Sequence, residues 1–98
     1  MFVHSVFFWL KEDLNDEERQ NFRKGVESLL TCEGVETGYV GTPAATSRPV
    51  VDSTYDFSVS VVMADLEAHD KYQDDPVHLE FIENFKNYWT KVQIYDAD

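Results

Sequence analysis

Cysteine, proline and glycine are scarce in this sequence, which has one, three and four of them in 98 residues. The single Cys32 has no partner for an internal disulfide and no metal-ligand spacing around it, so neither a disulfide framework nor a zinc-cysteine cluster is expected. Long hydrophobic runs are absent as well. The most apolar stretch, MFVHSVFFWL, is too short to span a bilayer and lacks the features of a signal peptide. The sequence therefore predicts a cytoplasmic protein.

Basic residues are also few, with eight Lys and Arg against nineteen Asp and Glu, and the formal net charge is −11. The basic residues are scattered rather than clustered. Binding to nucleic acid or to an anionic membrane surface depends on clustered positive charge, so neither partner is expected.

Hydrophobic residues make up 43% of the chain and aromatic residues 14%, which suits one compact domain over residues 1–98. A domain of this size buries roughly 60–70% of the surface that its unfolded chain exposes. Because that burial is modest, additional burial between subunits would stabilise the fold, and the size favours an oligomer.

The opening stretch alternates as a strand does, yet it is apolar on both faces. One face would carry His4, Val6, Phe8 and Leu10, and the other Val3, Ser5, Phe7 and Trp9. Antiparallel sheets of small proteins commonly leave one face to water. This strand therefore needs a cover on each side.

Residues 15–30 have helical spacing of apolar side chains, with Asn15 as the N-cap and Glu18 placed for a capping box. Gly34 ends this segment, and residues 35–41 predict a short edge strand interrupted by Gly38. Residues 42–53 predict a loop. Strict alternation then predicts a strand over residues 54–63, with one face made by Tyr55, Phe57, Val59, Val61 and Met63.

Two helices are predicted next, separated at Pro76 because the residue before a proline avoids helical angles. Asp65 would cap the first helix and Asp75 the second. The apolar stripe of the second helix is predicted to be His78, Phe81, Ile82, Phe85 and Trp89. Residues 91–96 predict a last strand.

The predicted order is β-α-β-β-α-β, which is the α+β ferredoxin-like sandwich. Helices cover only one face of such a sheet. We therefore expect a second copy of the chain to cover the other face, so that two sheets form a dimeric α/β barrel. The predicted homodimer interface consists of Val3, Ser5, Phe7 and Trp9.

Several of these features together resemble the stress-responsive dimeric α/β-barrel (Dabb) family. They are the opening strand with Val3 and His4, the capped first helix, the pair Tyr55 and Asp56, and the stretch YQDDPVHLEFI. The resemblance covers residues 2–96. It implies a homodimer with a cavity between helices and sheet in each subunit, in a family with few proven activities.

The resemblance also suggests site residues, through a distant similarity to olivetolic acid cyclase, a plant member that closes a polyketide by an aldol reaction without metal or cofactor. Its catalytic tyrosine and histidine fall on Tyr72 and His78, and a pocket histidine falls on His4. Other pocket positions differ: Asp75 and Phe57 replace histidines, and Val26 replaces a tyrosine. These differences count against a polyketide substrate. The predicted ligand-binding residues are His4, Val26, Phe57 and Phe81.

Tyr72 and His78 suit enolate chemistry, in which an imidazole removes a proton next to a carbonyl and a phenol donates a hydrogen bond to the oxyanion. The structural alternative is that His78 is a core residue with a hydrogen-bond partner. Two classes of function stay open: a small-ligand protein or cofactor-free enzyme, and a non-catalytic dimer with a closed core. A third possibility is a monooxygenase on the related dimeric ferredoxin-like fold, which only the similarity of fold supports.

Three histidines raise the question of a metal. His4, His69 and His78 have no paired metal-ligand spacing, so no metal site and no cofactor are predicted. His69 is expected to be a partly exposed surface residue.

Overall fold

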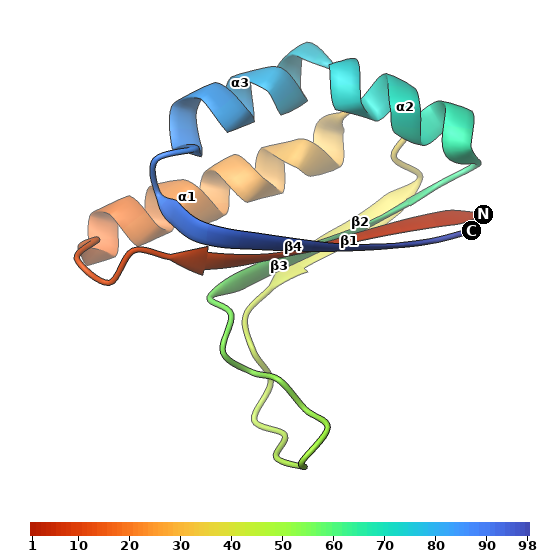
Figure 1. The fold of residues 1–98 in the computed structure, drawn as a ribbon. Coiled ribbons are helices and arrows are strands. Elements are labelled where there is room, and N and C mark those ends of the chain that lie inside the picture. Colours follow the sequence, from red (N-terminus) through yellow and green to blue (C-terminus); the bar gives the residue numbers. More distant parts are fainter.

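The structure, a computed structural model, describes residues 1–98 as a four-stranded antiparallel sheet with helices on one face (Figure 1). Along the chain the elements are β1 (Phe2–Leu10), α1 (Asp16–Ser28), the 3-10 helix η1 (Leu29–Thr31), β2 (Thr37–Gly41), β3 (Phe57–Met63), α2 (Leu66–Asp74), α3 (Pro76–Phe85) and β4 (Trp89–Ala97). The strand order is β2-β3-β1-β4. This is the predicted ferredoxin-like α+β fold.

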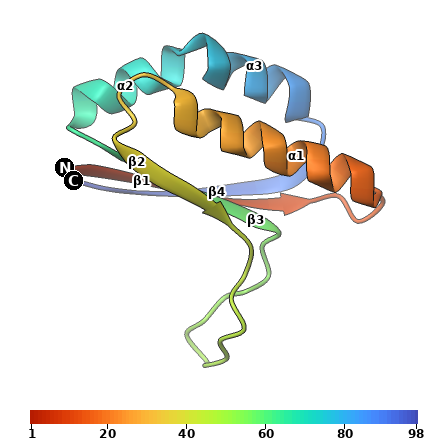
Figure 2. The same ribbon diagram turned by 180° about the vertical axis from the view of Figure 1, so that it is seen from behind.

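Strand β1 lies between β3 and β4, so its backbone is hydrogen-bonded on both edges. Its alternation is as predicted. Phe2, His4, Val6, Phe8 and Leu10 are buried beneath the helices, and the residues between them are half-buried on the opposite face. The turned view in Figure 2 shows that no element covers that opposite face.

Helix α1 begins as its sequence predicts. The Asn15 side chain accepts a hydrogen bond from the Glu18 backbone N–H at 2.8 Å, and the Glu18 side chain accepts one from the Asn15 N–H at 3.0 Å. Phe22 and Val26 on this helix are fully buried against the sheet. The cap fixes where the helix starts, and these two side chains fix which face it turns to the core.

The break between α2 and α3 also falls where the sequence places it. Asp65 accepts from the Ala68 N–H at 2.9 Å, and Asp75 accepts from the Val77 N–H at 2.8 Å. Asp75 has extended backbone angles ahead of Pro76, the conformation that proline imposes on its predecessor. The chain therefore turns sharply here and starts a new helix.

Two sequence predictions about residue placement are wrong. Helix α3 ends at Phe85, and Trp89 is the first residue of β4, where it pairs with Leu10 of β1. The backbone pairing with β1 prevails over continued helical spacing, although the Trp89 ring still packs 5.5 Å from that of Phe8. Tyr55 was expected to share a face with Phe57, but β3 begins only at Phe57.

Tyr55 lies instead on the face of the sheet that no helix covers, which we call the open face. Its ring centroid is 5.0 Å from that of Phe7. The cause is Asp56, whose side chain accepts a hydrogen bond from the Leu10 N–H at 2.7 Å and forms an ion pair with Arg19 at 3.2 Å. These contacts turn Asp56 toward β1 and α1, which interrupts the alternation just before the strand.

The segment between β2 and β3 is a long loop that extends from the sheet on the side away from the helices (Figures 1 and 2). Near its end, the Trp9 indole N–H donates to the Thr54 hydroxyl at 2.9 Å. Most of its other residues are exposed. None of the helices is long and apolar enough to cross a membrane.

Glycine is required at Gly38 because the neighbouring strand approaches closely. A Cβ placed there would lie 2.6 Å from the Ser60 carbonyl oxygen, whereas one at Gly41 on the same strand would meet nothing within 4 Å. We predict that Gly38→Ala lowers the free energy of unfolding by about 1–3 kcal/mol, the usual cost of overpacking, and that Gly41→Ala changes it little. Urea denaturation of both variants measures this. Equal stabilities would contradict the assigned register of β2.

Candidate functional site

The fold brings His4, Tyr72 and His78 to one cavity of about 130 Å³ between the helices and the sheet. His4 comes from β1, Tyr72 from the last part of α2, and His78 from the first turn of α3. Tyr72 and His78 lie on either side of the break at Pro76, and their rings are in contact across it. Most of the remaining wall is apolar and includes Val6, Phe8, Leu29, Phe81, Trp89 and Val92.

Aromatic contacts link Tyr72 to both His78 and His4. The Tyr72 ring centroid is 4.9 Å from that of His78 and 5.6 Å from that of His4, and both contacts are edge-on. Tyr72 is 1% exposed and His4 is 2% exposed. The tyrosine therefore contacts two imidazoles, in surroundings from which bulk water is largely excluded.

His78 has an unsatisfied polar atom at this site. Its Nδ1 is buried and has no hydrogen-bond partner. Leaving such an atom unpaired costs about 1–3 kcal/mol, so an unpaired buried nitrogen at a cavity wall is a position where a ligand group gains a hydrogen bond. The structural alternative, a core His78 with one hydrogen-bond partner, stays open, because the backbone of Gln73 lies within reach of this ring.

Burial sets the protonation states of Tyr72 and His78. Desolvation, followed by the nearby His4, lowers the pKa of His78, so its imidazole is neutral at neutral pH. Desolvation also raises the pKa of the Tyr72 phenol, which therefore keeps its proton. The arrangement combines a neutral imidazole, able to accept a proton, with a phenol, able to donate a hydrogen bond.

His4 is held by Asp96, a partner that the sequence reasoning missed. The two are cross-strand neighbours in the β1–β4 register, and His4 Nδ1 lies 2.5 Å from Asp96 Oδ1. Burial lowers the pKa of His4, and the Asp96 carboxylate opposes that shift. Pairing the first and last strands of the predicted sheet would have pointed to Asp96, but its register could not be read from the sequence.

Two of the predicted ligand-binding residues lie elsewhere. Val26 is fully buried, and neither it nor Phe57 lines the cavity, whereas His4 and Phe81 do. Phe57 borders a surface groove beside α1, where the Arg23 guanidinium lies 6.0 Å from its ring centroid.

The opening of the cavity does not lie at the Pro76 break. Residues 74–76 do not line it, and its most exposed lining residues are Ile82 at 37% and Ile94 at 45%. The opening therefore lies between α3 and the edge strand β4, and its rim is apolar.

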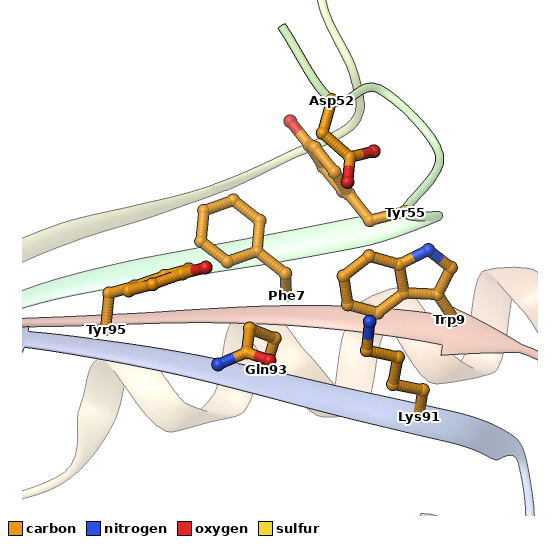
Figure 3. Close-up of a pocket in the computed structure, with 7 residues that line it drawn as sticks. All are labelled: Phe7, Trp9, Asp52, Tyr55, Lys91, Gln93 and Tyr95. Atoms are coloured by element: carbon orange, nitrogen blue, oxygen red, sulfur yellow. The ribbon is translucent and has the colours of Figure 1, made fainter. Parts of the chain in front are cut away.

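A second hollow, of about 170 Å³, lies on the open face of the sheet (Figure 3). Phe7, Trp9, Tyr55 and Tyr95 surround it together with Asp52, Lys91 and Gln93. The Lys91 ammonium lies 4.5 Å from the Trp9 ring centroid. Of the other residues predicted for an interface, Val3 is half-buried and Ser5 lies with its hydroxyl 3.2 Å from that of Ser60. The open face is thus rich in aromatic side chains, which surround a hollow about as large as the cavity on the other side of the sheet.

Cys32 offers no nucleophile to either hollow. It is 4% exposed, and burial together with the neighbouring Asp75 raises its pKa to about 11. A thiol in these surroundings stays protonated at neutral pH and acts as a core residue.

Comparisons with known proteins agree with this architecture. A family model described as the stress responsive A/B barrel domain (Dabb) matches residues 2–98. No curated protein matches the chain. Among solved structures, a Dabb family protein with a ferredoxin-like fold from Mesorhizobium loti is 25% identical over 99% of this chain and 94% of its own, with a TM-score of 0.79.

Two further solved structures are similar at lower identity. A dimeric ferredoxin-like protein of unknown function from Thermobifida fusca is 13% identical, covering 98% of this chain and 88% of its own, with a TM-score of 0.79. A hydroxynitrile lyase from Passiflora edulis is 16% identical, covering 98% and 90%, with the same TM-score of 0.79. At these identities the likeness is one of fold.

Proposed function

The chain belongs to the stress responsive A/B barrel domain (Dabb) family, and on that premise we propose that it forms a homodimer in which each subunit binds a small carbonyl-bearing or aromatic ligand between its helices and its sheet. The observation that best supports ligand binding is the buried His78 Nδ1, which has no hydrogen-bond partner and belongs to a ring that lines the cavity in edge-on contact with Tyr72. The dimer part depends on the open face.

The open face supports a homodimer because it leaves aromatic side chains uncovered in a chain that carries a net charge of −11. Tyr95 is 65% exposed there, beside Phe7 and Trp9. A second copy of the same sheet, packed face to face at about 10 Å, would cover them. The dimeric description of the Thermobifida fusca protein, which shares the fold, supports the same arrangement.

The cavity volume supports a small ligand over an extended one. At about 130 Å³ it is close to the roughly 150 Å³ of an apolar protein cavity known to bind benzene, and well below the volume of typical sites for larger molecules. A ring or a short chain with one carbonyl group would fit. The apolar rim at Ile82 and Ile94 allows an apolar extension of the ligand to reach the surface.

In such a complex the Tyr72 hydroxyl would donate a hydrogen bond to the carbonyl oxygen, and His78 would provide an acceptor on the other side. The raised pKa of Tyr72 favours this, because the phenol remains a donor at every physiological pH. The hydroxynitrile lyase shows that the fold can carry an enzyme, but fold similarity alone assigns no activity to this chain.

A second candidate function is enolisation, and the neutral state of His78 favours it. A neutral imidazole next to a bound ketone can remove a proton from the carbon beside the carbonyl, while Tyr72 donates a hydrogen bond to the enolate oxygen. This reaction class needs no metal. It includes aldol closures of the kind that the family resemblance suggests, on substrates small enough for the cavity.

The homodimer is tested with Tyr95→Glu. Because this side chain is mostly exposed in the single subunit, its replacement should leave the fold intact while placing a charge between the two sheets. We predict that the wild type elutes as a dimer and the variant as a folded monomer. Light scattering at micromolar concentration measures this, with circular dichroism as the check on folding.

Leu66→Glu, a 53% exposed leucine on α2, is the matched control and should stay dimeric. Phe7→Lys and Trp9→Lys should act like Tyr95→Glu, with an added loss of stability since these rings are half-buried. A folded wild-type monomer would contradict the dimer.

The ligand site is tested with Tyr72→Phe and the probes benzaldehyde and toluene. The variant keeps the ring and loses only the hydroxyl, so we predict a threefold to tenfold weaker affinity for benzaldehyde, the worth of about one hydrogen bond. Affinity for toluene, which has no carbonyl, should be unchanged. Proton NMR shifts of the His4 and His78 rings report the binding. Equal losses for both probes would contradict the hydrogen-bonding role.

Enolisation is tested by hydrogen–deuterium exchange of acetophenone at its methyl group in heavy water. We predict faster exchange with the wild type than with His78→Gln. The base must be neutral, so the rate should fall as the pH is lowered through the range of the His78 pKa, which lies below its ordinary value of 6.5. Equal exchange rates in the two proteins would contradict enolisation by His78 and leave ligand binding as the function of the cavity.

A further inference from the structure

Three side chains of types that can bind a metal ion lie together beside the cavity. They are His4 of β1, His69 of α2 and Asp96 of β4, and one donor atom from each lies within 4.8 Å of the other two. The sequence argument against a metal considered only spacing along the chain. These residues are far apart in the sequence, and only the folded sheet and the helix above it bring them together.

The three residues are positioned by regular elements rather than by loops. His4 and Asp96 are paired in the β1–β4 register. His69 is held over the sheet by ring contacts, 4.7 Å to Phe2 and 5.0 Å to His4 between centroids. His69 is partly exposed, as expected, with 14% of its side chain accessible, and the rest of the ring packs on β1. Donors fixed in this way lose little freedom when they bind an ion.

Two imidazoles and one carboxylate are a donor set that suits divalent zinc, cobalt, nickel and iron. In a tetrahedral site with bonds of roughly 2.0–2.1 Å, donors lie about 3.3 Å apart, so the His4–Asp96 edge of this triangle would lengthen from 2.5 Å and the edges to His69, at most 4.8 Å, would shorten. The His4 nitrogen and the Asp96 oxygen already face each other at 2.5 Å. An ion between them would take the place of the proton that they share, which would leave to solvent.

His69 would lose only weak hydrogen bonds on binding a metal ion. Its ring nitrogens have only long contacts, 3.3 Å to Asp70 and 3.3 Å to the Gln73 amide. The site also reaches solvent, because the Asp96 side chain is 38% exposed, so water can complete the coordination. The strongly acidic chain, at −11, attracts cations to its surface.

We propose that His4, His69 and Asp96 bind one divalent transition-metal ion per subunit, with water in the remaining positions. The site goes beyond the carbonyl ligand and does not rest on it, because neither His69 nor Asp96 lines the cavity. It shares His4 with the cavity, so an ion bound here would lie next to the cavity wall.

The test uses untagged protein, freed of metal with a chelator and titrated with cobalt chloride. We expect one cobalt ion per chain, with the visible absorption bands of cobalt bound to nitrogen and oxygen, and displacement by zinc chloride. His69→Gln and Asp96→Asn should each weaken binding by at least about tenfold. Both side chains are partly exposed, so both variants should fold, and circular dichroism checks this.

Glu67→Gln is the matched control, since it removes an exposed carboxylate from the same helix and should leave cobalt binding unchanged. Tyr72→Phe should also leave it unchanged, which separates this site from the carbonyl ligand. A wild type that binds no cobalt would overturn the proposal. So would binding that survives both His69→Gln and Asp96→Asn, because it would come from other surface carboxylates.

Discussion

The constraint on which this structure depends is that its central strand is apolar on both faces. Strand β1 is hydrogen-bonded along both edges, so it can be neither moved to the rim of the sheet nor left to water. The helices bury one face, through Phe8, Phe22 and Phe81, whose rings pack within 6 Å of one another. The other face keeps Phe7 and Trp9 half-covered. The domain is therefore complete in its backbone hydrogen bonding and incomplete in its hydrophobic burial.

The cavity follows from the same arrangement. Placing His4 in the middle of a buried strand face puts an imidazole where a close-packed core would have an aliphatic side chain, and the rings of Tyr72 and His69 and the Asp96 carboxylate lie against it. A polar group buried in this way needs partners, and Asp96 satisfies one of its nitrogens. His78 lacks even one partner at Nδ1. The core thus gives up some packing and some hydrogen bonding in one place, as binding sites do.

Much of this could be predicted from the sequence, because the signals were local. The Asn15 cap, the break at Pro76 and the alternation of β1 each depend on neighbouring residues, and all three are confirmed. The errors arose where a residue distant in the sequence determines the secondary structure or the face of a side chain. Trp89 fits a helical stripe but pairs with Leu10, and Tyr55 fits a strand alternation that Asp56 interrupts. The Asp96 and His69 contacts depend on strand register and helix placement, which no spacing along the chain encodes.

Because β1 and β4 are antiparallel neighbours, the two ends of the chain lie side by side, with Val3 opposite Ala97 (Figure 1). A short linker could join them, so a circularly permuted chain opened in the long loop between β2 and β3 should retain every strand pairing. The same proximity affects how the protein is handled. A polyhistidine tag at either end would place competing imidazoles next to His4 and Asp96, so purification tags belong in the loop or must be removed.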